Sequence, residues 1–421
     1  MPMSKGFARR LFPHLPEIVK KFGTPFHIYD AVGIEETGRQ FAKLFAKMPG
    51  GFKQFFAVKA LPNLEIMKMM LAMGFGFDCS SIPELIMARM VGAKPDDIMF
   101  TSNNTSNKEL SYAGKYGGCI LNLDDISFVE RFLITPELIC FRYNPGAERE
   151  GNSIIGNPEE SKYGVRKDQI VEAYCMAKEK GSERFGLHTM ICSNQLDYRY
   201  VVETVKMLLA VAVTLQEKLG IKLEFINIGG GIGIPYRPDQ NRFNLRALAS
   251  KTARELQKFK RLQGYAPKLY TECGRYMTGP HGVLVTRVIN RMEKYKPFIG
   301  VDASMTSLMR PALYGAYHHI QILGAERRKK ERTNVVGSLC ENNDWFAHDR
   351  LLPVARVGDI MIIQDAGAHG HAMGSQYNGR LRPQELLQKN GAVKIIRRAE
   401  TVKDYLCTQI EIEPAKISFR R

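Results

Sequence analysis

Residues 55–81, FFAVKALPNLEIMKMMLAMGFGFDCSS, contain a strand–helix–strand unit that indicates the fold class. The apolar runs FFAVKA (55–60) and GFDCSS (76–81) are typical of buried strands. Between them, LEIMKMMLAM (64–73) repeats apolar side chains every three and four residues, which is the spacing of an amphipathic helix. Strands that alternate with helices form parallel sheets, so this stretch predicts an α/β protein.

The same alternation continues as far as residue 274. Further strands are predicted at IMFT (98–101), CILNL (119–123), ICFRYN (139–144), RFGLHTM (184–190), LEFINIGG (223–230) and KLYTECG (268–274). Helical patterns lie between them at PELIMARMVG (83–92), VVETVKMLLAVAVTLQEKL (201–219) and LRALASKTARELQKF (245–259). Eight such strands match a (β/α)8 TIM-like barrel, which we predict over residues 33–283. An open, doubly wound sheet is the structural alternative.

The pattern changes after residue 283, where β-like runs are separated by turns rather than by long helices. These runs are GVLVTRVINRM (282–292), YHHIQILG (317–324), TNVVGSLC (333–340), DIMIIQDAG (359–367) and VKIIRRA (393–399). TPFHIYD (24–30), ahead of the first barrel strand, is also β-like. We therefore predict a second, mostly antiparallel β-domain, built from residues 1–32 and 284–421.

The 421-residue chain has a net charge of +17, yet its basic residues form no long blocks. The densest stretches, ERRKKER (326–332) and KIIRRAE (394–400), lack the interleaved aromatic side chains that stack on nucleic-acid bases. We expect a solvated basic surface suited to anionic ligands, and no nucleic-acid partner. No run approaches the ~18 apolar residues of a membrane span, so no membrane partner is expected either.

The eight cysteines are scattered and form no CxxC motif of the kind that binds a metal or exchanges disulfides. The N-terminus has basic residues but lacks the apolar core and cleavage site of a secretory signal. Reduced thiols in a cytoplasmic protein, without a bound metal, are therefore expected.

A TIM-like barrel carries its active site at the carboxyl ends of its strands, and polar residues end several of the predicted strands. Lys59 interrupts the apolar run of the first strand. It is either a strand-end lysine that extends to solvent or an amine of lowered pKa that forms a Schiff base. His188, at the end of the sixth strand, could stack on a ring or pack as an ordinary core histidine.

Glycines and an arginine near the last two strands indicate a phosphate site. The triplet Gly229-Gly230-Gly231 can bring backbone N–H groups close to a phosphate, because no Cβ obstructs the approach. Arg275 adds a cation where barrels commonly bind phosphate. A Schiff-base lysine beside such a site points to pyridoxal 5′-phosphate, and Glu272 would keep the pyridine nitrogen protonated. A buried Glu272–Arg275 ion pair is the structural alternative.

The chain resembles the alanine-racemase-type (fold type III) pyridoxal-phosphate enzymes, and within that class diaminopimelate decarboxylase. The resemblance runs from about residue 22 to residue 390. Its landmarks are GTPFHIYD (23–30), FFAVKALPN (55–63), GFDCSSIPEL (76–85), SKYG (161–164), INIGGGIGI (226–234), ECGRYMTGP (272–280), MRPALYGAYH (309–318), CENND (340–344) and YNGRLRPQEL (377–386).

The resemblance implies roles for the matching positions. Lys59 would carry the cofactor, and Cys340 would return a proton to the substrate. The cofactor would be held by Lys59, Asp78, His188, Ser193, Gly230, Gly231, Glu272, Gly274, Arg275 and Tyr377. The substrate would be held by Arg275, Arg310, Tyr314, Glu341 and Tyr377. Because Cys340 and Glu341 would enter the site from a second subunit, a homodimer with shared active sites is implied.

Four departures from the family pattern bear on the substrate. The family's HxHIGS segment reads HTMICS (188–193), so that a ring-stacking histidine becomes Met190. EPGR reads ECGR (272–275), and CESGD reads CENND (340–344). GAY reads Gly367-Ala368-His369, which removes a tyrosine that would contact the phosphate.

The implied activity is pyridoxal-phosphate-dependent decarboxylation of a diamino acid, with meso-diaminopimelate, converted to lysine and CO2, as the first choice. Arg310 supports that choice, because a cation in the distal pocket suits a second carboxylate. The four departures leave open a decarboxylase of D-ornithine, D-lysine or another specialised amino acid. An amino-acid racemase and an inactive regulatory homologue are further alternatives, although retention of Lys59 and Cys340 argues against the last.

Overall fold

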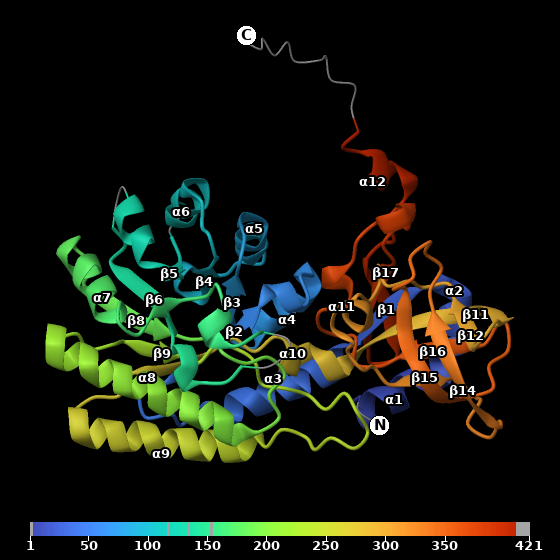
Figure 1. The fold of residues 1–421 in the computed structure, drawn as a ribbon, viewed down its shortest axis with the longest axis horizontal. Helices are drawn as coiled ribbons and strands as arrows, with labels where there is room; N and C mark the ends of the chain where they lie inside the picture. Colours follow the sequence, from blue (N-terminus) through green and yellow to red (C-terminus); the bar gives the residue numbers. More distant parts are fainter. Residues whose placement is uncertain (1–2, 116–117, 133–134, 152–154, 410–421) are drawn as a thin grey trace, which may run out of the picture.

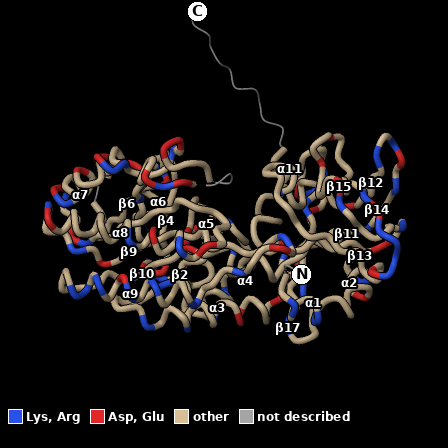
Figure 2. Tube along the Cα trace, turned by 60° about the horizontal axis from the view of Figure 1, so that its bottom comes forward, with Lys and Arg blue, Asp and Glu red and all other residues tan. Residues whose placement is uncertain are grey.

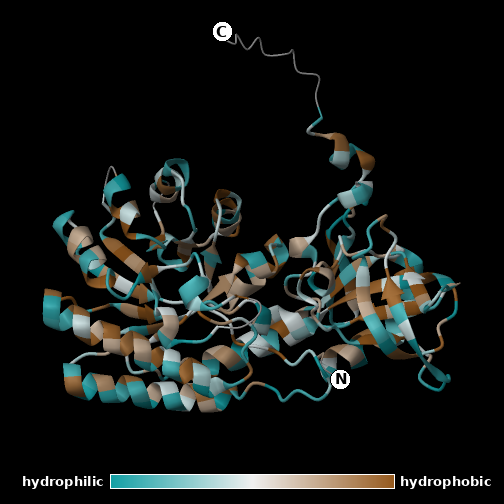
Figure 3. Ribbon diagram, viewed as in Figure 1, coloured by the Kyte–Doolittle hydropathy of each residue, from teal (hydrophilic) through white to brown (hydrophobic). Residues whose placement is uncertain are grey.

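The computed structural model describes residues 3–115, 118–132, 135–151 and 155–409. A barrel of strands and helices lies beside a β-rich domain, and the two are joined by the chain segments near α3 and α10 (Figure 1). In both domains the strands are mostly apolar, whereas the helices on the outside of the barrel alternate apolar and polar stripes (Figure 3). This division is the one expected when each sheet buries one face and each helix buries one stripe.

Eight parallel strands close the barrel, each paired with the next and the last paired with the first. They are β2 (Phe52–Ala57), β3 (Gly76–Cys79), β4 (Ile98–Thr101), β5 (Ile120–Leu123), β6 (Leu138–Asn144), β8 (Arg184–His188), β9 (Phe225–Asn227) and β10 (Lys268–Thr271). A short β7 (Val165–Arg166) pairs with the end of β6. The predicted barrel is therefore confirmed, and the open doubly wound sheet is wrong because β10 pairs with β2.

Helices cover the outside of the barrel, and several of them begin at a polar side chain that caps them. They are α3 (Ala31–Phe45), α4 (Leu64–Ala72), α5 (Ile82–Met90), α6 (Asn107–Gly114), α7 (Ile170–Glu179), α8 (Tyr198–Leu219), α9 (Leu245–Gln263) and the short α10 (Arg275–Thr278). Asn63 caps α4 by accepting from the Glu65 N–H, and Ser81 caps α5 by accepting from the Glu84 N–H. Such caps satisfy N–H groups that have no partner inside the helix.

Large side chains fill the amino-terminal half of the barrel interior. Phe55, Met99, Phe225 and Tyr270 pack there in one buried cluster, and the rings of Phe225 and Tyr270 stack with centroids 4.3 Å apart. The barrel is therefore closed at that end, which leaves the carboxyl ends of its strands as the place where polar side chains can gather.

The second domain is built on a nine-stranded sheet. Its strands are β1 (Phe26–Asp30), β11 (Gly282–Glu293), β12 (Pro297–Val301), β13 (Ile320–Ile322), β14 (Lys330–Val336), β15 (Trp345–Pro353), β16 (Ile360–Ile363), β17 (Gln384–Lys389) and β18 (Ala392–Arg397). Most neighbours are antiparallel, and only β1–β17 and β12–β14 are parallel among the described strands. The sequence-based prediction of a mostly antiparallel sheet that includes the segment around residues 24–30 is confirmed.

This domain also contains helices, which are not among the elements predicted from the sequence. They are α1 (Lys5–Leu11), α2 (Leu15–Phe22), α11 (Arg310–Tyr314) and α12 (Val402–Leu406). Phe7 and Leu11 of α1 pack against Phe26 and Ile28 of β1 in one buried cluster. The predicted domain of residues 1–32 and 284–421 also includes residues 1–2 and 410–421, which lie outside the described residues.

The basic residues are spread over the whole chain. Lys and Arg segments lie on the barrel helices and on the second domain, next to acidic segments (Figure 2). The net charge of +17 is therefore not confined to one element. Within the part of the chain that the structure describes, no helix has both the length and the apolar character needed to cross a bilayer.

We expect His27 to make the stability of the fold depend on pH. His27 on β1 is fully buried, and its Nε2–H donates to the Ser307 carbonyl at 3.0 Å. Burial lowers its pKa to about 4. The unfolded chain, with a histidine pKa near ~6.5, then binds the proton more readily, so stability falls as pH drops from ~6.5 to ~4, by roughly 3 kcal/mol from this residue.

Chemical unfolding of His27→Gln at a series of pH values tests this expectation. The variant should have a shallower slope in the free energy of unfolding than the wild type over that interval, by the share that His27 contributes, while buried His281 and His371, whose pKa values are also lowered, keep the remainder. His14→Gln, at an exposed histidine, is the matched control and should keep the slope. Equal slopes for His27→Gln and the wild type would contradict the expectation.

Candidate active site

Lys59 lies at the carboxyl mouth of the barrel, one turn beyond the strand that was predicted to contain it. Strand β2 ends at Ala57, and Lys59 occupies a single 3-10 turn, Val58–Ala60. The Lys59 Nζ atom lies 3.4 Å from Oδ2 of Asp78, the last residue but one of β3. The Lys59 side chain is 52% exposed whereas that of Asp78 is 1% exposed, so the amine faces the open mouth and the carboxylate lies behind it.

The expectation of a lowered pKa for Lys59 is wrong for this chain. The Asp78 carboxylate raises the pKa of Lys59 above its ordinary value, and Glu272 and Glu84 act in the same direction against burial. Lys59 is thus held as an ammonium by its neighbours. Its nucleophilic form requires that a proton leave toward one of these acids or toward solvent.

Glu272, at the end of β10, forms the buried acidic centre of the mouth. One carboxylate oxygen lies 3.0 Å from His188 Nε2, and the other accepts from Asn227 Nδ2 at 2.7 Å. Burial opposes ionisation of Glu272, but His188, Lys59 and Asn227 together hold its pKa below its ordinary value. Burial and the charge of Glu272 raise the pKa of Asp78. Glu272 is therefore the carboxylate that stays charged.

Glu272 does not pair with Arg275, so the structural alternative of a buried Glu272–Arg275 ion pair is wrong: the partners of the carboxylate are His188 and Asn227. His188 is buried at the end of β8 and its Nδ1 has no hydrogen-bond partner among the described residues, nor does Oδ1 of Asp78. Asn227 was missed in the sequence, although it stands at a strand end in INIGG.

The glycine triplet forms a loop in which side chains have no room. A Cβ on Gly230 would lie 2.6 Å from the Glu272 carbonyl oxygen, and Gly231 adopts φ +81° with a Cβ position 2.5 Å from the Cys192 carbonyl oxygen. The Gly230 N–H lies 3.3 Å from the Met190 sulfur. Ser193 belongs to the adjoining loop, whose Gln195 N–H donates to the Gly231 carbonyl at 2.8 Å.

Arg275 and Arg310 come from different domains and meet at one tyrosine. Arg275 Nη1 donates to the Tyr236 hydroxyl at 2.5 Å, and the Arg310 guanidinium carbon lies 4.5 Å from the centre of the Tyr236 ring. Gly274, which precedes Arg275, packs so closely that a Cβ would lie 2.6 Å from the Ala60 Cβ, next to Lys59. Tyr236 was not predicted; it follows the glycine loop in GIPY (233–236), and no spacing rule places it between two arginines.

Arg310 is a buried cation on which the buried Asp365 carboxylate acts electrostatically without an ion-pair contact. Its side chain is 3% exposed, and no ion pair with it occurs among the described residues. Arg310 Nη1 donates to His318 Nε2 at 2.8 Å, while His318 Nδ1–H donates to the Gln364 carbonyl at 2.8 Å. Burial and Arg310 keep the pKa of His318 well below its ordinary value, so the imidazole stays neutral and accepts. Arg310 therefore retains donors for an anion.

His369 belongs to the same cationic region. Its backbone N–H donates to the Ala60 carbonyl at 2.8 Å, which places the residue beside the turn that carries Lys59. Burial, followed by the charges of Arg275, Arg310 and Lys59, lowers the pKa of His369 well below its ordinary value. The imidazole therefore stands neutral among three cations.

The other predicted residues lie at the surface of the second domain. Tyr314 and Tyr377 are 44% and 50% exposed, and Cys340 is exposed as well. Glu341 follows Cys340, and its Oε1 accepts from the Asn343 N–H. Within the described residues, no hydrogen bond or ion pair joins any of these four side chains to Lys59 or Glu272.

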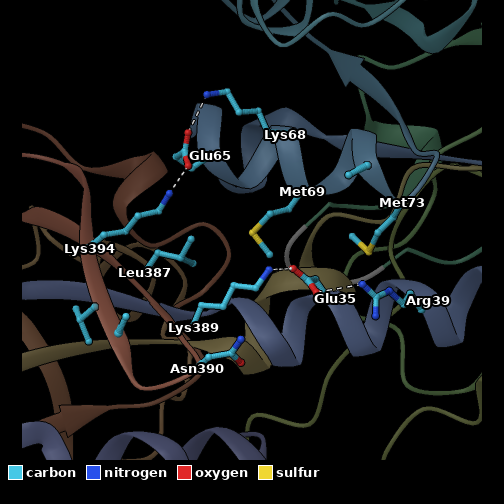
Figure 4. Close-up of a pocket in the computed structure, with 13 residues that line it drawn as sticks. Glu35, Arg39, Glu65, Lys68, Met69, Met73, Leu387, Lys389, Asn390 and Lys394 are labelled. Atoms are coloured by element: carbon cyan, nitrogen blue, oxygen red, sulfur yellow. Dashed lines mark hydrogen bonds and ion pairs between the residues drawn. The ribbon is translucent and has the colours of Figure 1, made fainter.

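A groove on the surface lies away from the barrel mouth. It has a volume of about 820 Å³ and lies between α3, α4 and the β17–β18 hairpin, and it includes none of the predicted site residues. Met69 and Met73 point toward it from α4 and its end, and ion pairs such as Glu35–Lys389 and Glu65–Lys394 frame it (Figure 4). In the part of the chain that is described, no cluster of three or more His, Cys, Asp or Glu residues is arranged to bind a metal.

The groups at the barrel mouth fit a phosphorylated pyridine aldehyde. They combine an amine at Lys59, a charged carboxylate at Glu272 for a ring nitrogen, and a loop at Gly230 without room for Cβ atoms, suited to a phosphate. Asp78 Oδ1 and His188 Nδ1, on strands β3 and β8, are buried and have no hydrogen-bond partner among the described residues. The groups at the mouth are the ones that pyridoxal 5′-phosphate requires: an amine for its aldehyde, a carboxylate for its ring nitrogen and a loop for its phosphate.

Comparison with known proteins supports the same cofactor. Residues 33–279 match a family model described as pyridoxal-dependent decarboxylase, pyridoxal binding domain. The chain is 48% identical over 406 residues to the protein TabA of Pseudomonas amygdali pv. tabaci, covering 96% of each. It is 39% identical over 399 residues to the diaminopimelate decarboxylase of Methanothermobacter thermautotrophicus, covering 93% of this chain and 92% of the relative.

A solved structure shares the whole architecture. The diaminopimelate decarboxylase from M. jannaschii, in co-complex with L-lysine, superposes with a TM-score of 0.86 at 29% identity, covering 94% of each chain. The barrel and the second domain are therefore those of an amino-acid decarboxylase. The chain belongs to the pyridoxal-dependent decarboxylases of the diaminopimelate decarboxylase type, and its cofactor is pyridoxal 5′-phosphate.

Proposed function

We propose that this enzyme decarboxylates meso-diaminopimelate to lysine and CO2, in lysine biosynthesis. The observation that carries the proposal is Arg310, a buried guanidinium in ion-pair contact with no carboxylate among the described residues, which meets Arg275 at Tyr236. A second carboxylate at the far end of the substrate would give this cation its missing partner. The relative from M. jannaschii was solved with L-lysine, the product of that reaction.

Each residue at the barrel mouth would have its own role in the reaction. When bound, the cofactor supplies an electrophilic carbon and an electron-withdrawing ring. Lys59 would hold the cofactor until the substrate amine replaces it, with Asp78 as the nearest acid for its proton. Glu272 would hold a proton at the ring nitrogen, and His188 orients that carboxylate. The N–H groups of the glycine loop, Ser193, Arg275 and Tyr377 would bind the phosphate.

The substrate would be held from both domains. Arg310 and Tyr314 would contact its distal end, and Glu341 would bind the distal amine. The thiol of Cys340 would return a proton to the carbon that loses CO2. Since Cys340 and Glu341 lie at the surface of their own chain, we propose that they act in the site of a second copy. Exposed Leu313, beside Tyr314, supports burial of this face in a homodimer.

Mixing two inactive variants tests the shared site. Lys59→Ala and Cys340→Ala homodimers should each be inactive, whereas their mixture should recover activity, because a heterodimer rebuilds one intact site. After complete random exchange, half of the dimers carry that site, so about one quarter of the wild-type activity is expected. Lys59→Ala mixed with the double variant Lys59→Ala/Cys340→Ala is the control and should stay inactive. No recovery, once exchange is verified by mass, would contradict sharing.

A decarboxylase of D-lysine, D-ornithine or another specialised amino acid is the second candidate. The position of Met190 favours it, because its sulfur lies 3.3 Å from the Gly230 N–H where the family pattern has a histidine. His369, which replaces a tyrosine of that pattern, favours it also. CO2 release from a panel of diamino acids of both hands decides between the candidates. Preference for meso-diaminopimelate supports the first, and preference for D-lysine or D-ornithine supports the second.

We also propose that the enzyme works in the cytoplasm. All eight cysteines lie within the described residues and none forms a disulfide. A reducing compartment keeps such thiols free, including Cys340 at the surface.

A further inference from the structure

The loop that carries Cys340 is folded around one buried carboxylate. Asp344 is 3% exposed, and its two oxygens accept from the Met305 N–H at 2.6 Å and the Leu339 N–H at 2.8 Å. A Cβ on Gly337, where the loop begins, would lie 2.4 Å from the same carboxylate. Asp344 therefore organises the inner side of the loop, and the described hydrogen bonds of its carboxylate go to Met305 and Leu339 rather than to Cys340.

The segment after Tyr377 holds the outer side of this loop. Oδ1 of Asn378 accepts a hydrogen bond from the Cys340 N–H at 2.6 Å. Two residues further on, Arg380 Nη2 donates to the Ser338 carbonyl at 3.0 Å. Asn378 adopts φ +56°, a conformation that asparagine, aspartate and glycine tolerate best. Among the described residues, Asn378 is the one side chain that bonds the backbone of Cys340.

We propose that Asn378 is a positioning residue for Cys340, and that through it the Tyr377 segment of one active site sets the thiol of the other. The proposal rests on the proposed function, in which Cys340 acts in the site of the second subunit. The Cys340 N–H bond orients the Cα–Cβ bond of an otherwise exposed residue, and so restricts where the thiol points. Tyr377 and Asn378 are consecutive in the chain. The segment that holds the cofactor in one site of the dimer therefore also fixes the thiol that enters the other site.

Two substitutions separate the hydrogen bond from the backbone conformation. Asn378→Gly keeps the left-handed conformation and removes the acceptor, whereas Asn378→Asp keeps both. In the homodimer, we expect Asn378→Gly to lower kcat by about threefold to tenfold with little change in KM, since one hydrogen bond of positioning is lost. Asn378→Asp should restore most of that loss. The absorbance of the bound cofactor and the unfolding midpoint report whether each variant is folded and loaded.

Heterodimers locate the effect. In the mixture of Lys59→Ala and Cys340→Ala chains, the intact site takes its thiol from the Lys59→Ala chain and its lysine from the Cys340→Ala chain. Asn378→Gly placed in the Lys59→Ala chain should therefore lower activity more than the same change in the Cys340→Ala chain, where Asn378 holds no thiol and only adjoins Tyr377 of the intact site. Loss from the second placement alone, equal loss from both, or loss from neither would each overturn the proposal.

If the proposed function is wrong, a separate measurement still tests the role of Asn378. If the parent mixture shows no activity, shared sites are wrong, and the alkylation rate of Cys340 by iodoacetamide in the homodimeric holoenzyme tests the positioning by itself. Asn378→Gly should change that rate at least about threefold, and Asn378→Asp should restore it. Equal rates in the wild type and Asn378→Gly would overturn the role of Asn378.

Discussion

Replacing Lys59 with alanine is expected to lower decarboxylation by more than about 10³-fold, because the group that carries the cofactor and receives it back is lost. The structure places this amine 3.4 Å from Asp78, at the mouth where Glu272 and the glycine loop also follow their strands. Borohydride reduction of the wild-type holoenzyme, followed by peptide mapping, should find the pyridoxyl group on Lys59. The variant should show no such adduct.

Lys53, on the strand that precedes the Lys59 turn, supplies the matched control. Its Nζ donates to Asp97 Oδ1 at 2.5 Å and to the Asp96 carbonyl at 2.6 Å, at the opposite end of β2. Lys53→Ala should therefore retain activity and the label on Lys59. A label on Lys53 or Lys68 in the wild type would refute the assignment.

Replacing Arg310 with methionine is expected to lower kcat/KM for meso-diaminopimelate by about 10²- to 10³-fold, while D-lysine turnover falls far less. Methionine would leave the distal carboxylate of the substrate without its cation, and losing one partner of a buried charge pair costs about 3–5 kcal/mol. D-lysine has no distal carboxylate and loses only packing against Tyr236. The measurement is the ratio of kcat/KM for the two substrates in each enzyme.

Arg350 provides the control for this experiment. Its Nη1 donates to the His318 carbonyl at 3.0 Å, and its guanidinium carbon lies 3.9 Å from the centre of the Tyr317 ring rather than that of Tyr236. Arg350→Met should leave the substrate ratio unchanged. Equal losses for both substrates in Arg310→Met would contradict the role of Arg310, and a wild-type preference for D-lysine would transfer the proposal to the second candidate.

Much of the site could be predicted because parallel strands bring their ends together. Lys59, Asp78, His188 and Glu272 each end a strand of the barrel or follow one directly, and a closed barrel places all such ends on one rim. The period of apolar residues was enough to locate the strands and therefore the rim. The direction of the pKa shift of Lys59 could not be predicted, because it depends on how near the Asp78 carboxylate lies.

The sequence alone thus determined the barrel, the mostly antiparallel second domain and the residues at the barrel mouth, because hydrophobic period and strand ends are local properties of the chain. Only the tertiary structure decided that Arg275 and Arg310 meet at Tyr236, and that Asn378 bonds the backbone of Cys340. These contacts join loops from different parts of the chain. Loop geometry follows from the packing of two domains, for which a single sequence carries no periodic signal.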